Sequence, residues 1–292
     1  MTYKLLIGQR AYSSWSLRGW LPFDAFGIDV DVHKAEIYGD TFAREVADFA
    51  GGATVPAVVT PGGGRLTDSL GIAWHLAEAF PERGLLPSDP VARAEAQSLI
   101  ATMHSGFAAL RGACPMNLWT AYEGFEPDAG VSADLARLDT LLSAALERSG
   151  GPFLHGDYTL SDVFYAPVAT RIATYGLPVS ATLSAYVETQ LAHGAMRRWR
   201  AMALAENITL SVYDMPLKRR GYPAPPTLKA KVTDGPSVNA ACPYSGRPVT
   251  HFLHLDGTTW GFCNAFCRDK TLADPLAWPD FVALAGLEGP KG

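Results

Sequence analysis

The stretch Tyr12-Ser13-Ser14-Trp15-Ser16-Leu17-Arg18 lies between an apolar run, residues 3–7, and an amphipathic segment, residues 17–26. The run is typical of a buried strand and the segment of a helix. A helix that begins beside Ser13 and Ser14 places its unpaired backbone N–H groups and the positive end of its dipole at this corner. Such a corner binds anions and favours a thiolate over a neutral thiol. Serine is also a preferred N-cap, so helix capping alone is the alternative interpretation.

Length and composition limit the classes of protein to consider. The chain has 292 residues, 48% of them apolar and 18% charged, which indicates a folded protein of two domains with room for an appendage. Its net charge of −5 provides no basic footprint for nucleic acid or an anionic membrane. There is no signal-peptide pattern, and no apolar run reaches membrane-spanning length. We therefore expect a cytoplasmic protein.

The first domain, residues 1–82, alternates between strand and helix patterns. The order strand, helix, strand, helix, strand, strand, helix predicts a small mixed sheet covered by helices. The expected strands are 4–7, 29–35, 57–60 and 65–67, and the expected helices are 16–26, 42–49 and 69–80.

Two dipeptides in this domain carry possible function. Val55-Pro56 precedes the third strand, where the proline is either an edge-strand residue or a cis bond that turns the backbone toward a ligand. Asp68-Ser69 starts the last helix of the domain. There it either binds the ammonium and carboxylate groups of an amino acid or only caps the helix.

Together these elements resemble the three glutathione-contacting elements of the thioredoxin-like domain of glutathione transferases. The Ser-Ser-x-Ser-x-Arg run is most similar to the serine-type zeta class. The resemblance implies that Ser13 donates a hydrogen bond to the glutathione thiolate, with Ser14 as the other candidate. It also implies that Val55, before a cis Pro56, pairs with the tripeptide backbone, and that Asp68 and Ser69 hold the γ-glutamyl end.

The resemblance has three departures, one of which is that residues 52–54, just before Val55-Pro56, lack the basic or amide side chain often found there. This chain has Trp15 where the zeta class has cysteine, a difference that bears on the maleylacetoacetate isomerase activity of that class. The acidic position of the γ-glutamyl site is Asp68 rather than the commoner glutamate.

Residues 90–215 have an entirely helical pattern, as in the all-helical domain of this family. One apolar stripe, which makes Cys114 a buried hydrophobe rather than a reactive thiol, consists of Leu99, Met103, Phe107, Leu110 and Cys114. On the same expected helix, His104 and Arg111 share a face. They either lie on the surface or line the acceptor cleft, where Arg111 would pair with a substrate carboxylate.

Two further segments of this domain have an expected role. A loop that we expect to form the wall of the acceptor pocket contains Asn117, Trp119 and Tyr122, while Trp15 is expected to contribute from the first domain. Thr159-x-x-Asp162 is a capping box, which we expect to be structural.

The tail lies outside this resemblance. Residues 216–240 are rich in proline and read as a linker, and residues 241–292 contain a hairpin pattern around Asp256-Gly257. The cysteines Cys242, Cys263 and Cys267 resemble those of the small treble-clef modules of the YHS or TRASH type, which bind metals. Zinc is expected to need a fourth ligand from His254 or His251, because Ser245 stands where a second cysteine is usual. The alternative is a metal-free relic held together by apolar packing.

The leading functional hypothesis is therefore a homodimeric glutathione transferase, with glutathione as co-substrate and a small electrophile as acceptor. Two alternatives remain open. One is a non-catalytic binding or regulatory protein with a metal-binding tail, and the other is a glutathione-dependent disulfide reductase or isomerase. The identity of the acceptor is not encoded in these motifs.

Overall fold

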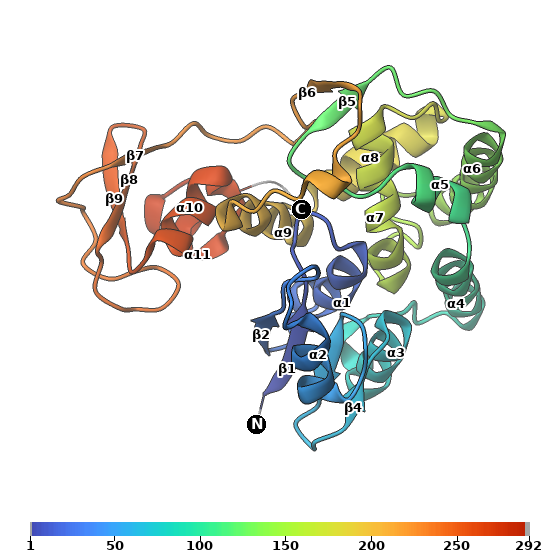
Figure 1. The fold of residues 1–292 in the computed structure, drawn as a ribbon, viewed down its shortest axis with the longest axis horizontal. Coiled ribbons are helices and arrows are strands. Elements are labelled where there is room, and N and C mark those ends of the chain that lie inside the picture. Colours follow the sequence, from blue (N-terminus) through green and yellow to red (C-terminus); the bar gives the residue numbers. More distant parts are fainter. Residues whose placement is uncertain (1, 290–292) are drawn as a thin grey trace. The chain divides into compact units, whose positions relative to one another are not determined.

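The computed structural model describes residues 2–289 and divides into two compact units (Figure 1). The first unit comprises Met1–Leu191 with Leu210–Pro223, and the second comprises Ala192–Thr209 with Ala224–Gly292. The chain therefore leaves the first unit, contributes to the second, and returns before it leaves again. Among the described residues, no helix has both the length and the apolar character needed to cross a membrane.

The sheet of the first unit has the strand order β2-β1-β3-β4, with β1 parallel to β2 and antiparallel to β3. The expected order of elements is confirmed, with boundaries that differ by one or two residues. The elements are β1 (Tyr3–Ile7), α1 (Ser14–Ala25), β2 (Val30–Lys34), α2 (Phe42–Ala50), β3 (Ala57–Val59), β4 (Arg65–Leu66), α3 (Ser69–Ala79) and the short η1 (Pro81–Arg83).

Side-chain alternation along β1 directs the packing of the helices. Leu6 joins a buried cluster with residues of α2, whereas Leu5 lies near α1 on the other side of the strand. Gly19 permits α1 to approach closely, because a Cβ atom at this position would lie 2.5 Å from the ring of Pro56. The start of α1 is thereby held beside the Val55–Pro56 bond, which is cis.

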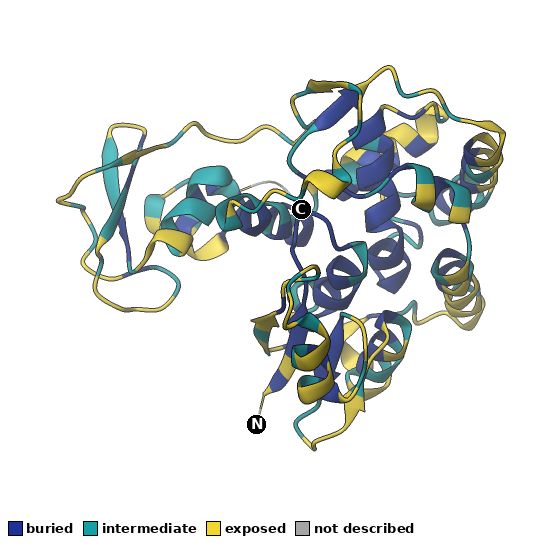
Figure 2. Ribbon diagram, viewed as in Figure 1, coloured by how far each residue is buried: buried dark blue, intermediate teal, exposed yellow. Residues whose placement is uncertain are grey.

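Helices make up most of the remainder of the first unit. They are α4 (Pro90–Ser105), α5 (Ala108–Ala113), α6 (Ala129–Ser149), α7 (Leu160–Tyr175) and α8 (Ala181–Ala192). Helix α7 is buried along nearly its whole length, as its dark blue colour in Figure 2 shows, and it packs against α1 and α4. It is the central helix of this part of the chain.

The expected capping box of α7 is present. Asp162 is fully buried and accepts hydrogen bonds from the backbone N–H groups of Thr159 (2.9 Å) and Leu154 (3.1 Å) and from the Tyr186 hydroxyl (3.1 Å). Burial raises the pKa of Asp162 to about 6, and these hydrogen bonds act in the opposite direction.

One expected helix is broken into two. The apolar stripe from Leu99 to Cys114 is buried as predicted, but α4 ends before Gly106, and Phe107 adopts a left-handed conformation (φ 58°) before α5 begins. The prediction that His104 and Arg111 share one helix was therefore wrong. The break nevertheless joins them, because the Arg111 guanidinium donates to the carbonyl oxygens of His104 and Gly106, both at 3.2 Å.

The segment 210–223, which we call the returning segment, completes the first unit. It contains the single turn η2 (Ser211–Tyr213) and the strand β6 (Lys218–Arg220), which pairs antiparallel with β5 (Ala121–Glu123). The Leu210 N–H donates to the Tyr12 hydroxyl (3.1 Å), and the Tyr213 ring stacks on Tyr12 with 4.7 Å between ring centroids.

The second unit combines α9 (Gly194–Glu206) with the C-terminal tail. The predicted hairpin is confirmed as β8 (His251–Leu255) and β9 (Thr258–Phe262), and β7 (Lys231–Thr233) adds a third strand. The hairpin is followed by α10 (Ala265–Ala273), η3 (Pro275–Ala277) and α11 (Pro279–Ala285). The segment expected as a linker thus contains β6 and β7, one in each unit.

Helix α9 is anchored to the tail by a buried ion pair. Helices α9 and α10 pack together, and the Arg197 guanidinium binds both carboxylate oxygens of Asp274, at 2.7 and 2.8 Å. Arg197 also donates to the Pro226 carbonyl (3.3 Å), which secures the start of the tail. Two parallel hydrogen bonds of this kind are the strong geometry for an arginine–carboxylate pair.

Candidate functional site

A relay of serine hydroxyl groups forms the start of α1. Ser13 is the N-cap, and its oxygen accepts the Ser16 N–H (3.2 Å) while its hydroxyl contacts the Ser16 hydroxyl (2.8 Å). Ser16 in turn accepts the Gly8 N–H (2.9 Å). Both serines are buried, so these hydrogen bonds fix the corner between β1 and α1.

Ser14 lies on the open side of this corner and is half-buried. Its oxygen accepts a hydrogen bond from the Arg171 guanidinium (3.4 Å). Arg171 comes from the buried helix α7, and its other donors bind the carbonyl oxygens of Cys114 (2.8 Å) and Pro167 (3.0 Å). A cation is therefore held rigidly beside the helix start.

These groups border a pocket of about 360 Å³ within the first unit. It is lined by residues from six parts of that unit, namely Tyr12, Ser13, Ser14, Trp15, Ile37, Phe42, Thr54, Val55, Arg111, Pro115, Met116, Arg171 and Tyr213. The predicted residues Ser13, Ser14, Trp15, Val55 and Arg111 are thus brought together around one cavity.

Three arginines give the site a positive charge. Burial lowers the pKa of Arg18 to about 9 and that of Arg171 to about 10, with repulsion from Arg111 as a further cause for each. The Arg18 guanidinium lies 4.0 Å from the Trp15 ring centroid, and Arg111 lies 5.1 Å from the same centroid. The Nε and Nη1 atoms of Arg18 are buried without a hydrogen-bond partner among the described residues.

The second predicted anion corner is the start of α3. Asp68 is its N-cap, with the side chain accepting the Leu70 N–H (2.7 Å), and this side chain remains about half exposed. Ser69 is completely buried, and its hydroxyl oxygen has no hydrogen-bond partner within the described chain. A buried hydroxyl without a partner is unusual and suits a ligand that supplies one.

The structure places the remaining predicted pocket residues differently. His104 lies behind Trp15 with 5.5 Å between ring centroids and is 3.9 Å from Asp68, and burial lowers its pKa. Asn117 and Tyr122 are buried and hydrogen-bonded to each other (3.3 Å), and Trp119 donates its backbone N–H to Asn117 (2.9 Å). The 117–122 segment thus supports the interior of the first unit and is not part of the pocket lining.

Sequence reasoning missed four residues of this site: Tyr12, Ser16, Arg171 and Tyr213. Ser16 and Tyr12 stand inside the quoted stretch, and only their hydrogen bonds distinguish them. The one signal for Arg171 was a charged residue within an otherwise apolar helix pattern, which is unusual unless the charge is paired or functional. Tyr213 lies beyond the helical domain in sequence and reaches the pocket only because the chain returns.

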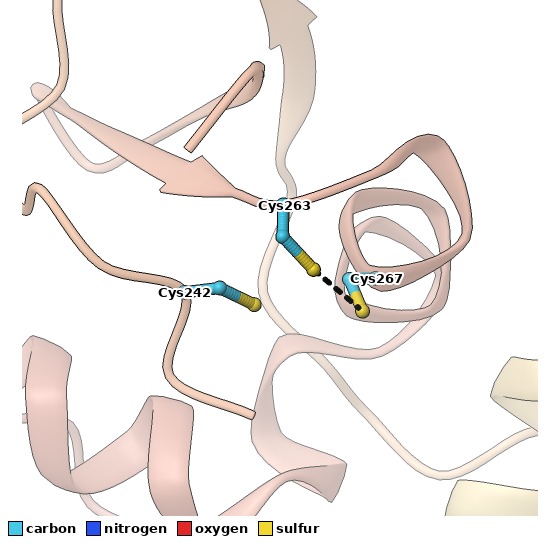
Figure 3. A group of neighbouring side chains, drawn as sticks. All are labelled: Cys242, Cys263 and Cys267. Atoms are coloured by element: carbon cyan, nitrogen blue, oxygen red, sulfur yellow. Dashed lines mark hydrogen bonds between the residues drawn. The ribbon is translucent and has the colours of Figure 1, made fainter. Parts of the chain in front are cut away.

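A separate cluster of thiols lies in the second unit (Figure 3). The sulfur atoms of Cys242, Cys263 and Cys267 all lie within 4.8 Å of one another, and those of Cys263 and Cys267 are 3.9 Å apart. The predicted fourth ligand His254 lies outside this group and contacts Thr259 at 3.5 Å. The oxygen beside the sulfurs is that of Ser245, 3.3 Å from the Cys263 sulfur.

The buried Cys114 belongs to neither site. It is fully enclosed in the first unit, and burial raises its pKa to about 12. The prediction that Cys114 lies buried in the core is confirmed.

Comparison with known proteins identifies relatives of the first unit. Residues 12–79 match the family model described as glutathione S-transferase, N-terminal domain. The chain is 25% identical over 177 residues to a protein of Caenorhabditis elegans named as a probable maleylacetoacetate isomerase, and the match covers 59% of this chain and 79% of that protein.

Solved structures share the fold. A glutathione transferase Omega 2S of Trametes versicolor has a TM-score of 0.54 at 21% identity, covering 73% of this chain and 99% of that one. A glutathione transferase homologue of Burkholderia, solved with bound glutathione, has a TM-score of 0.52 at 22% identity, covering 70% and 98%. These likenesses agree with the expected combination of a thioredoxin-like domain and a helical domain.

Proposed function

We propose that the chain belongs to the glutathione S-transferase family, and that its first unit binds glutathione and transfers it to an electrophile that carries a carboxylate. The observation that carries this proposal is the pocket itself. It joins a helix start rich in hydroxyl groups to arginines that have no carboxylate partner among residues 2–289.

Ser13 is the proposed donor to the glutathione thiolate. Its hydroxyl faces Ser16 in the unliganded arrangement, but a hydroxyl group can rotate. If the Ser16 hydroxyl rotates so that its proton points to Ser13, three hydrogen bonds form a series. The Gly8 N–H donates to Ser16, Ser16 donates to Ser13, and Ser13 donates to the glutathione sulfur. Each hydrogen bond in such a series polarises the next, which strengthens the final one to the anion.

The other ends of glutathione have proposed partners as well. The backbone of Val55, which lines the pocket, pairs with the tripeptide main chain. The buried Ser69 hydroxyl and the α3 N-terminus receive the γ-glutamyl carboxylate, and Asp68 receives its ammonium group. This arrangement supplies the hydrogen-bond partner that Ser69 lacks.

We infer the carboxylate of the acceptor from the positive charge of the arginines at the pocket. Arg111 and Arg171 line the pocket, and Arg18 lies beside Trp15, one of the lining residues. Buried arginines that repel one another are stabilised when an anion binds between them. The name of the Caenorhabditis relative refers to a carboxylate substrate, which supports the same class of acceptor.

The first test is calorimetric titration of the purified protein with glutathione. We expect binding that an Asp68→Ala and Ser69→Ala double variant loses. Absence of binding to the wild-type protein at millimolar glutathione would exclude the transferase and favour a non-catalytic binding protein.

The second test compares matched acceptors, each offered as a free carboxylate and as its methyl ester. We expect Arg171→Gln to lower kcat/KM for the acid about tenfold or more, because a hydrogen bond to a charged group contributes about 1.5–3 kcal/mol, and to have little effect on the ester. Arg148→Gln, at an exposed arginine paired with Glu95, is the matched control. Equal losses for acid and ester would contradict a carboxylate site.

We also propose two properties that the resemblance to this family implies, a homodimer and a cytoplasmic location. Light scattering of the purified protein tests the first, and fractionation of the source cells tests the second.

The second unit has a proposed function of its own, the binding of a metal ion. Its support is independent of the pocket and consists of three free thiols brought together from separate segments.

A further inference from the structure

We propose that Cys242, Cys263 and Cys267 bind zinc through three thiolates and leave a fourth coordination position open beside the hydroxyl of Ser245. The inference rests on the proposed metal binding of the second unit and deepens it by assigning the ion and its coordination. A zinc ion with three protein ligands accepts an exchangeable fourth ligand, whereas a closed structural site does not.

The three sulfurs lie close enough together to share one ion. Cys242 precedes the hairpin, Cys263 directly follows β9, and Cys267 lies in the first turn of α10, so the fold brings together three separate positions (Figure 3). Thiolates about 2.3 Å from a tetrahedral zinc ion lie about 3.8 Å apart. The separation of 3.9 Å between the Cys263 and Cys267 sulfurs agrees with this geometry.

Hydrogen-bond donors lie beside the sulfurs of the cluster. The backbone N–H groups of Cys263 and Tyr244 hydrogen-bond the Cys242 sulfur. The Asn264 side chain donates to the Cys263 sulfur (3.5 Å) and caps α10 by accepting the Cys267 N–H (2.8 Å). Hydrogen bonds of this kind orient metal ligands and stabilise their charge.

The fourth position lacks a strong protein ligand among the described residues. His254 contacts Thr259, and the His251 ring contacts the Thr250 hydroxyl at 2.9 Å. Neither belongs to the group of atoms around the sulfurs.

The residue that does adjoin the cluster is Ser245, which contacts the sulfurs of Cys242 and Cys263. A neutral hydroxyl is not among the usual zinc ligands, so it leaves the position to a ligand from solution. A small thiol matches this position, because sulfur is a preferred zinc donor and the Ser245 hydroxyl can donate a hydrogen bond to it.

The metal itself is tested first, on the full-length protein expressed with added zinc. Elemental analysis is expected to find about one zinc per chain, lost in Cys263→Ala and retained in Cys114→Ser, whose thiol lies in the core of the first unit. Less than about a tenth of an equivalent in the wild type would overturn the proposal. Zinc content does not depend on glutathione turnover, so this result is separate from the fate of the transferase proposal.

The open position is tested by replacing zinc with cobalt(II), whose visible absorption bands report the ligand set. Added 2-mercaptoethanol is expected to shift the bands of the wild type. Ser245→Cys is expected to shift them in the same direction without added thiol and to abolish the response, because it supplies a fourth thiolate. His254→Ala is expected to leave the spectrum unchanged.

Two results would overturn the open coordination even if zinc is present. One is a wild-type spectrum that does not respond to the thiol, and the other is a spectrum that changes in His254→Ala. The Ser245→Cys variant keeps the test informative if a cysteine-to-alanine variant fails to fold, because it adds a ligand rather than removing one.

Discussion

Ser13 and Ser16 show how one residue type performs two roles within a single turn. Ser13 caps α1 and faces the pocket, and Ser16 supports it from behind with a hydrogen bond to the backbone of Gly8. The capping interpretation and the thiolate interpretation of this stretch are therefore compatible, since the same oxygen accepts the Ser16 N–H and can donate its own proton to a ligand.

The hydrogen bonds between Ser13 and Ser16 predict that Ser16, which does not line the pocket, affects the pKa of bound glutathione. Ser16→Ala removes the group behind Ser13, so we expect the pKa of enzyme-bound glutathione to rise without loss of glutathione affinity. Ser13→Ala should raise it further, by about one to two pH units, since the hydrogen bond to a charged sulfur contributes about 1.5–3 kcal/mol. The measurement is the thiolate absorbance of the complex as a function of pH.

Ser105→Ala, at an exposed serine whose hydroxyl donates to the Ala101 carbonyl of the same helix, is the matched control for these variants. An unchanged thiol pKa in Ser13→Ala would show that this serine does not contact the sulfur. An effect of Ser13→Ala without any effect of Ser16→Ala would retain the donor and reject the relay.

Local motifs predicted individual residues well where the chemistry is contained in a short stretch. Ser13, Val55 and Trp15 all line the pocket, because their positions follow from one strand–helix corner and one proline. Arg171 was not predicted, since it depends on how α7 packs against α1. His254 likewise lies outside the group of cysteine sulfurs, since on β8 it contacts Thr259.

At the scale of elements, the capping box of α7 makes a prediction about stability. Two oxygens of Asp162 accept hydrogen bonds from three residues in the interior. Asp162→Asn replaces an acceptor with a donor there, so we expect the free energy of unfolding to fall by about 1–3 kcal/mol. Chemical denaturation measures it, and an unchanged midpoint would contradict the interpretation.

The pKa of the Asp162 carboxyl group predicts how the loss of stability in Asp162→Asn depends on pH. Burial raises the folded-state pKa of Asp162 from its ordinary value near 3.8 to about 6, so its protonated form favours folding. The stabilisation is complete below about pH 4 and is lost as the pH rises through about 6. The deficit of Asp162→Asn should therefore be larger near pH 4 than near pH 7, and the opposite trend would show that the carboxylate is the favoured form.

The break between α4 and α5 explains an error that periodicity could not avoid. The apolar spacing continues unchanged across Gly106, so the pattern predicts one helix. A Cβ atom at Gly106 would lie 2.6 Å from the Thr102 carbonyl oxygen, and Phe107 turns left-handed directly after it. Such a turn is determined by tertiary packing. It allows the Arg111 guanidinium to donate a hydrogen bond to the His104 carbonyl.

The returning segment predicts a residue that determines specificity. Tyr213 lines the pocket, stacks on Tyr12 and hydrogen-bonds the Tyr38 hydroxyl (3.2 Å). Tyr213→Ala should raise KM for the acceptor about two- to tenfold, because an aromatic pair contributes about 0.5–1.5 kcal/mol beyond its buried area.

Tyr38→Phe is the control for that variant, since it removes only the hydroxyl contact and leaves both rings in place. Steady-state kinetics with several acceptors provide the measurement. Identical kinetic constants in Tyr213→Ala for every acceptor would remove this tyrosine from the site.

For the whole molecule, the division into two units predicts two separable stabilities. A ligand that binds only the folded form of one unit stabilises that unit by mass action. The proposed ligands are glutathione for the first unit and zinc for the second. We expect two thermal transitions, of which glutathione raises one and removal of metal by a chelator lowers the other. A single transition that both treatments shift together would show that the units unfold as one.

Composition, periodicity and motifs were sufficient to predict the sheet, the helical part and the C-terminal hairpin, because each is built from neighbours in sequence. They divided the chain at 215, which groups α9 with the helices before it, whereas in the structure α9 packs against α10. The ion pair between Arg197 and Asp274 joins residues that are distant in the chain, so no local sequence pattern predicts it.

The Arg197–Asp274 ion pair also affects whether the chain can be truncated and how it folds during synthesis. During synthesis α9 leaves the ribosome before the tail that packs against it. The Arg197–Asp274 ion pair therefore forms only after Asp274 has been synthesised. A gene cut after residue 223 would remove Asp274 together with α10, and so expose the face of α9 that packs against this helix. The tail is thus a requirement for the end of the helical region, and a stop codon before it should give an insoluble product rather than a smaller enzyme.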